Sequence, residues 1–164
     1  MEYEQNLKKR ILKGEKSIKE KSKIQIQKAS AVFETLPKDI RLSIFSSLKQ
    51  TNPETLEAIL NAMFVFEDIV KLNDVDIQAI IFEIKDMSVL SKSLKKASTE
   101  LVEKFKNNMS ERLLNQFNTT DTELSQVVDD EIDDAQYQVV RALRELEKNE
   151  RIAKLSAMKR DTNE

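Results

Sequence analysis

Residues 52–66 read NPETLEAILNAMFVF, and this stretch contains the clearest helix start in the chain. Asn52 is of a type that caps helices, and Pro53 suits the first helical position because it has no N–H group to leave unbonded. Apolar residues then recur at spacings of three and four, which places them on one helical face. They are Leu56, Ile59, Leu60 and Met63. The stretch therefore predicts a one-sided helix that ends in a run of large apolar residues.

That run consists of Met63, Phe64, Val65 and Phe66. Four large apolar side chains in succession cannot all lie on one face of a helix. Either the helix end is buried on all sides, or the run is a junction between two helical units with a bend at the following Glu67 and Asp68. The residues alone leave both interpretations open.

The composition extends the helical prediction to the whole chain. Among 164 residues there is one glycine, and tight β-hairpins need several residues that enter left-handed turns freely. With 40% hydrophobic and 34% charged residues, most helices must be one-sided. Further helices are expected at about residues 26–36, 38–48, 74–84, 86–94, 98–105, 110–117 and 130–149. The predicted fold is all-α, with short helices stacked in pairs as in armadillo-like proteins.

The residue types that are missing restrict the chemistry. Without Cys or His, the chain has no thiolate nucleophile, no His-based triad and no zinc site of the usual ligands. Asp129 with Asp133, and Asp130 with Asp134, stand one helical turn apart, but no glycine-containing calcium loop accompanies them. We therefore expect no enzyme, no catalytic residue, no cofactor and no bound metal.

Charge is balanced in total and uneven along the chain. The net charge of -2 argues against general nucleic-acid binding, which needs a basic excess to neutralise phosphates. Residues 1–28 hold nine Lys or Arg against four Glu, whereas residues 121–134 hold seven acids and no base. Both segments can be solvated faces, and the acids also suit a helix N-terminus. Alternatively, the basic segment, expected to be a frayed or partner-dependent helix over residues 2–22, binds an anionic membrane or an acidic partner.

The sequence also bears on location. Glu2 and Glu4 stand where a signal peptide would be basic, and no apolar h-region follows them. The longest nearly apolar stretch, residues 58–66, is far shorter than a bilayer span. A cytoplasmic location is therefore the expectation.

Four short motifs resemble one protein family. Residues 63–68, MFVFED, resemble the MFVF motif of the flagellar rotor switch protein FliG, and residues 108–112, NMSER, are similar to a second signature of its C-terminal domain. Between them, residues 94–97 resemble the family's Leu-Lys-Gly-Ala, and residues 133–136 are similar to the opening of its last long helix. The four motifs occur in the family's order and with nearly its spacing, over about residues 26–152.

The resemblance implies a non-enzymatic rotor component at the flagellar basal body, on the cytoplasmic face of the inner membrane. An armadillo-like unit would be joined to a C-terminal bundle of about six helices. The implied divisions are a basic arm (1–22), the armadillo-like unit (23–66), the bundle (67–152) and a loose tail (153–164). Implied partners are a MotA-like stator loop, a FliM-like switch protein and other FliG subunits.

The family also implies roles for single residues. Lys95 and Arg112 match two basic residues of the ridge that meets the stator, and Met63, Phe64, Val65 and Phe66 match the hinge used in directional switching. Without the resemblance, Lys95 and Arg112 are ordinary surface charges. The acidic pair of the family's ridge falls on Thr119 and Thr120 here, and the following arginine falls on Val128.

Overall fold

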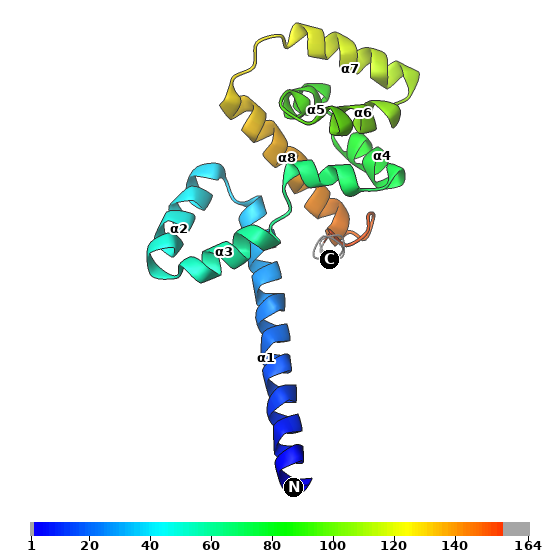
Figure 1. The fold of residues 1–164 in the computed structure, drawn as a ribbon. Helices are drawn as coiled ribbons and strands as arrows, with labels where there is room; N and C mark the ends of the chain where they lie inside the picture. The colour runs from blue at the N-terminus through cyan, green and yellow to red at the C-terminus, as the bar shows by residue number, and fades with distance from the viewer. Residues whose placement is uncertain (1, 156–164) are drawn as a thin grey trace. The chain divides into compact units, whose positions relative to one another are not determined.

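The computed structural model describes residues 2–155, apart from the side chains at positions 2–4, 7 and 18. Within that span every regular element is helical and no strand occurs, so the all-α prediction is confirmed (Figure 1). The chain divides into two compact units between Met63 and Phe64. Unit 1 contains α1 (Glu2–Thr35), α2 (Lys38–Thr51) and α3 (Pro53–Ala62). Unit 2 contains the 3₁₀ helix η1 (Phe66–Lys71), α4 (Asp74–Glu83), α5 (Met87–Leu94), α6 (Thr99–Asn107), α7 (Glu111–Glu123) and α8 (Asp129–Lys148).

Helix α1 differs from the prediction, which separated a basic helix at 2–22 from an apolar one at 26–36. The structure has one continuous helix of 34 residues. Gly14 does not interrupt it, because glycine costs only about 1 kcal/mol relative to alanine inside a helix. The helix ends at Thr35, just before Leu36, because the proline ring at Pro37 disfavours the helical conformation of the residue in front of it.

In unit 1, α3 packs against both α1 and α2. Helices α1 and α2 also meet through Phe33 and Phe45, whose ring centroids are 5.2 Å apart. The buried Ser30 hydroxyl of α1 lies 3.2 Å from the backbone carbonyl of Ile59 in α3. None of the α2 residues is buried, so this helix is attached through half-covered side chains only.

The core of unit 2 forms where α8 packs against α5, α4 and η1. Helix α5 in turn contacts α7, so it lies between α7 and α8 (Figure 1). Apolar side chains with no exposed surface come from η1, α4, α5, α6 and α8; they are Ile69, Ile77, Ile80, Leu90, Leu101, Phe105, Val139 and Leu143. Leu155 is 1% exposed and belongs to the same core, although it lies in the segment 153–164 expected to be loose. The rest of that segment, residues 156–164, lies outside the described residues.

The predicted helix starts are confirmed by their capping hydrogen bonds. Asn52 Oδ1 accepts from the Thr55 N–H at 3.1 Å, with Pro53 at the first helical position. Four other caps accept in the same way at the starts of α4, α5, α6 and α7: Asn73, Asp86, Ser98 and Ser110. Each bond satisfies one of the N–H groups that a helix start leaves without an intrahelical acceptor.

None of the helices in the described part of the chain is both long and apolar enough to cross a membrane.

One carboxylate is buried without full compensation. Asp76, in the first turn of α4, is 5% exposed, and its Oδ2 atom has no hydrogen-bond partner among the described residues. Burial raises the pKa of Asp76 and outweighs a hydrogen bond with Asn73 that lowers it. An unpaired buried charge of this kind destabilises the folded state.

Replacing Asp76 by alanine is therefore expected to increase the free energy of unfolding at pH 7 by about 1 kcal/mol. Because the folded-state pKa is raised, Asp76 contributes stability at pH values below its ordinary pKa and loses that contribution as pH rises through the folded-state value. The advantage of Asp76→Ala should therefore shrink as pH is lowered. Urea denaturation followed by circular dichroism at several pH values measures both effects.

The control is Glu103→Ala, which removes an exposed acid from α6 and should change stability at pH 7 by less than about 0.5 kcal/mol. Loss of stability in Asp76→Ala at pH 7 would contradict the interpretation of Asp76 as a destabilising charge.

Candidate protein-interaction site

The apolar run at residues 63–66 is not helical. Helix α3 ends at Ala62, Met63 and Val65 have extended backbone angles, and η1 begins at Phe66. Over residues 64–66 the side chains alternate as in a strand: Phe64 and Phe66 are 4% and 6% exposed, whereas Val65 is 53% exposed. Met63 is also buried. The bend expected at Glu67 and Asp68 thus lies a few residues earlier.

Residues 64–66, which follow the boundary between the units, are fixed by packing and by a hydrogen bond. Phe64 and Phe66 belong to the core of unit 2, and the guanidinium carbon of Arg144 lies 6.0 Å from the centre of the Phe64 ring. Asp68 Oδ2 accepts from the Val65 N–H at 3.0 Å, which fixes the start of η1. The boundary between the two compact units falls inside the motif, between Met63 and Phe64.

Lys95, one of the two predicted ridge residues, is engaged within the chain. It follows the last residue of α5, and its side chain is only 22% exposed. Lys95 Nζ lies 2.7 Å from Asp121 Oδ1 and donates to the Asp121 backbone carbonyl at 3.0 Å. Ser91 Oγ donates to the same carboxylate at 2.8 Å. These bonds join the end of α5 to the last turns of α7.

The electrostatics of Asp121 agree with this geometry. Partial burial raises the pKa of Asp121, but hydrogen bonds from Lys95 and Ser91, together with the positive charges of Lys95 and Lys106, outweigh it and leave the pKa below its ordinary value. The charge on Lys95 is therefore largely neutralised by a neighbour in the same unit.

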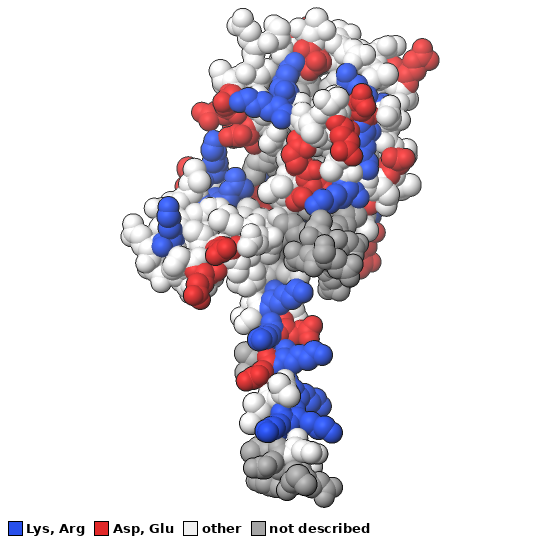
Figure 2. All heavy atoms as spheres, in the orientation of Figure 1, with Lys and Arg blue, Asp and Glu red and all other residues white. Residues whose placement is uncertain are grey.

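Two further lysines of the α5 region pair with acids at the start of α8. Lys92 Nζ lies 2.9 Å from Glu131 Oε1, and Lys96 Nζ lies 2.6 Å from Asp129 Oδ1. The bond from Lys92, together with the Val128 N–H, lowers the pKa of Glu131. Acidic and basic side chains accordingly alternate over the visible surface of unit 2 (Figure 2). Part of the acidic run thus neutralises lysines that lie more than thirty residues away in the chain, and these pairs could not be predicted from the sequence.

Arg112 differs from Lys95. It lies exposed in the first turn of α7 and forms no ion pair with any described residue. Of the positions where the family carries further ridge charges, Thr119 is exposed and Val128 is 64% exposed, whereas Thr120 is half-buried. The two predicted ridge residues are therefore unequal: the cation of Arg112 is exposed, whereas the cation of Lys95 is partly covered and paired with Asp121.

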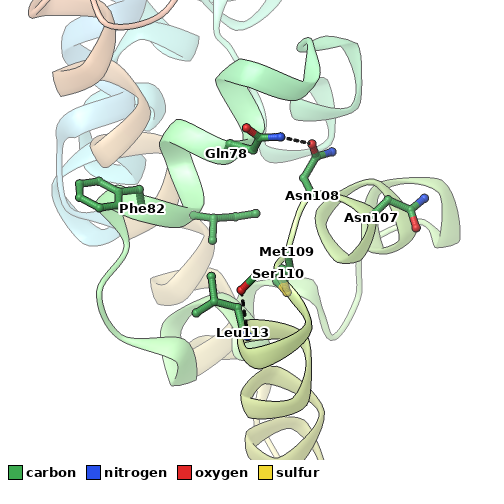
Figure 3. Close-up of a pocket in the computed structure, with 8 residues that line it drawn as sticks. Gln78, Phe82, Asn107, Asn108, Met109, Ser110 and Leu113 are labelled. Atoms are coloured by element: carbon green, nitrogen blue, oxygen red, sulfur yellow. Dashed lines mark hydrogen bonds between the residues drawn. The ribbon is translucent and has the colours of Figure 1, made fainter.

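A cleft of about 420 Å³ lies between α4 and the turn that leads into α7 (Figure 3). Four apolar side chains line it, namely Ile81, Phe82, Met109 and Leu113. The other four lining residues are Gln78, Asn107, Asn108 and Ser110. None of the eight carries an acid or a base, so this cleft offers no pair of groups for proton transfer.

Asn108 has a structural role beside this cleft. Its Oδ1 accepts from Gln78 Nε2 at 3.1 Å, and its Nδ2 donates to Asp74 Oδ1 at 3.0 Å and to the Lys104 carbonyl at 2.9 Å. The amide therefore fastens α4 to the end of α6. Ser110 caps α7, since its Oγ accepts from the Leu113 N–H at 3.3 Å. In the motif at residues 108–112, Asn108 and Ser110 therefore have structural roles, whereas Arg112 is exposed to solvent.

Among the side chains that the structure describes, no group of three or more acids is placed so that it could hold a metal ion.

Residues 46–153 match the model of the family described as the FliG C-terminal domain. This match covers more than half of the chain and crosses the boundary between the two units. The chain belongs to the FliG C-terminal domain family. Among its relatives, the flagellar motor switch protein FliG of Thermotoga maritima is 35% identical over 122 residues, which cover 74% of this chain and 36% of that protein. FliG of Aquifex aeolicus is 37% identical over 118 residues, covering 72% of this chain and 36% of the relative.

Solved FliG structures have the same fold. A crystal structure of a FliG fragment from Helicobacter pylori superposes with a TM-score of 0.70 at 29% identity, covering 79% of this chain and 60% of the fragment. The structure of full-length FliG from Aquifex aeolicus gives a TM-score of 0.52 at 35% identity, covering 76% of this chain and 38% of the other. These matches confirm the predicted FliG resemblance and the predicted architecture of an armadillo-like part with a helical bundle. The family is one of motor switch proteins, in agreement with the expectation that the chain is not an enzyme.

The ion pair between Lys95 and Asp121 should be measurable as a coupling in stability. Because both partners are held by further hydrogen bonds, we expect Lys95→Gln and Asp121→Asn each to lower the free energy of unfolding by about 1 kcal/mol. The double variant should lose less than the sum of the two single losses. Denaturant unfolding of the four proteins gives this coupling energy.

The matched control is Arg112→Gln, which should change stability by less than about 0.5 kcal/mol because Arg112 forms no ion pair with the described residues. Strict additivity of Lys95→Gln and Asp121→Asn would show that the pair contributes nothing. Since the pKa of Asp121 is lowered, its stabilising contribution is present above the ordinary pKa and is lost as pH falls through the folded-state value.

Proposed function

We propose that this chain is a non-enzymatic component of the flagellar motor switch, acting in torque or direction control by binding other rotor and stator proteins. The observation that carries the proposal is the continuous family match over residues 46–153, which includes both the MFVF junction and the whole of α7. In this function the chain acts at the cytoplasmic face of the inner membrane, at the flagellar basal body. The chain spans 36% of the length of the Thermotoga and Aquifex relatives, so its assembly into a rotor is part of the proposal.

Unit 1 is proposed to bind a FliM-like switch protein or another FliG subunit. Its helix α2 has no buried residue, and large apolar side chains remain exposed on all three helices of the unit. They include Val32 at 57%, Ile40 at 46%, Leu42 at 54% and Leu60 at 47% exposure. Stacked helical units bury such side chains against a neighbouring unit, and exposed apolar surface of this kind is typical of protein interfaces.

Leu42→Glu tests this interface. A charge in place of an exposed leucine should leave the fold intact but weaken binding to FliM or to full-length FliG about tenfold, which is about 1.4 kcal/mol. Titration calorimetry with the purified partners measures the affinity, and circular dichroism checks the fold.

Ser47→Glu is the control, because it adds the same charge at another exposed position of α2. Equal loss of binding in both variants would indicate a general charge effect. Unchanged binding in Leu42→Glu would remove Leu42 from the interface.

Arg112 is proposed as the main cation for a MotA-like stator loop. Solvent screens an exposed ion pair, so its contribution is about 1 kcal/mol or less, and weak contacts suit rapid stepping between rotor and stator. Lys95 is proposed to act mainly by holding the end of α7 through Asp121, with a smaller direct contribution to the ridge.

Arg112→Glu should weaken binding of the MotA cytoplasmic loop about fivefold at low salt, and the difference should disappear at high salt. Arg141→Glu, at an exposed position of α8, makes the same change of charge away from α7 and is the control. Fluorescence anisotropy of a labelled loop peptide follows both. A salt-independent loss, or an equal loss in the control, would contradict a specific role of Arg112.

The residues Met63, Phe64, Val65 and Phe66 are proposed as the hinge between the units. Support comes from the end of α3 at Ala62 and from the extended backbone that follows it. The peptide between Met63 and Phe64, where the two compact units divide, is the natural place for the change in backbone angles.

A further inference from the structure

Much of α1 has no packing partner within its own unit. Helix α1 contacts the rest of unit 1 through α3 and, at Phe33, through α2. The first residue along α1 that is not classed as exposed is Ile26. All described side chains from Gln5 to Gln25 are exposed. This segment, residues 5–25, is called the basic arm below. At 1.5 Å per residue it extends for about 30 Å.

The basic arm has few of the features that stabilise a helix standing alone in water, although Glu15 and Lys19 stand at the favourable i, i+4 spacing. Gly14 lies in its middle, and several lysines repeat at spacings of three or four, where like charges repel. They include Lys9, Lys13, Lys16 and Lys19. Isolated helices of this length are marginal in water even with favourable sequences. A surface that neutralises the lysines would therefore stabilise the helical form.

The positive charge of the arm is concentrated on one side. At 100° per residue, six lysines fall within an arc of about 140°. They are Lys8, Lys9, Lys13, Lys16, Lys19 and Lys23, all of them exposed; the arc also contains Gln5, Leu12 and Glu20. Figure 2 shows Lys and Arg side chains gathered along α1. Such a face fits a flat, negatively charged surface.

The predominance of lysine over arginine in the basic segment favours a lipid surface over a protein as its binding partner. Eight of the nine basic residues in positions 1–28 are lysine. Protein interfaces are enriched in arginine, which binds carboxylates through two parallel hydrogen bonds, and depleted in lysine. Clusters of four to eight basic residues on a one-sided helix are typical of segments that bind anionic phospholipids.

We infer that the lysine face of the basic arm binds the anionic headgroups of a phospholipid membrane and lies along its surface. The inference goes beyond the proposed rotor function, because it uses residues outside the FliG family match, which begins at residue 46. Membrane contact would hold the chain against the bilayer by charge, without insertion of a spanning helix.

The test is flotation of the full chain with vesicles of phosphatidylcholine alone or mixed with phosphatidylglycerol. Binding is expected only with the anionic vesicles and should fall as salt is raised. The variant Lys9→Gln, Lys16→Gln, Lys23→Gln removes the centre of the lysine face and should weaken binding on the order of a hundredfold, or about fivefold per lysine.

The matched control is the variant Arg10→Gln, Lys21→Gln, Lys28→Gln. It removes the same charge from the same helix, about 100° or more around the axis from the centre of the lysine face. A clearly smaller loss in this control supports the lysine face, and equal losses would overturn it.

Binding to neutral vesicles, or no flotation with anionic vesicles at low salt, would also overturn the inference. Self-association of the chain in the absence of vesicles would overturn it as well, if high salt and the first variant both abolish that association. The arm would then bind the acidic residues of a second copy and not a membrane. The variants Leu42→Glu and Arg112→Glu should float like the parent chain, so failure of the rotor function and failure of membrane binding are separable.

Discussion

The apolar face of α8 is the constraint on which unit 2 depends. Six of its residues are buried, and burial of each larger aliphatic side chain contributes about 1.5–3 kcal/mol. They are Ile132, Ala135, Val139, Val140, Leu143 and Leu146. Helix α5 packs against this face, and α7 packs against α5. The order of these layers determines which charged residues of the unit can meet.

The ion pairs of unit 2 follow from that packing. Because α5 lies between α7 and α8, the lysines just after its end reach acids on both: Lys95 reaches Asp121 in α7, and Lys96 reaches Asp129 in α8. Lys95, which the family resemblance placed on the ridge, is thereby paired inside the unit. In the proposed function, recognition of other proteins would depend more on Arg112 and on the exposed apolar residues of unit 1 than on a row of equivalent charges.

Local features could be predicted from sequence, because their causes lie within a few residues. Asn52, Asn73 and Ser98 cap helices through bonds to N–H groups three residues later, and the sequence shows both partners together. The pair of Lys95 and Asp121 could not be predicted, since 26 residues separate them and only the packing of α5 on α7 brings them together. The conformation of residues 63–66 could not be predicted either, because a helical and an extended backbone both bury part of the run.

The alternation in that run has a mechanical consequence. Phe64 and Phe66 are embedded in one unit, while α3 of the other unit ends at Ala62. The connector is thus about one residue long, too short to hold any slack. One residue spans at most about 3.6 Å, so the proposed hinge would allow rotation about the Met63 backbone bonds but would not let the connection lengthen.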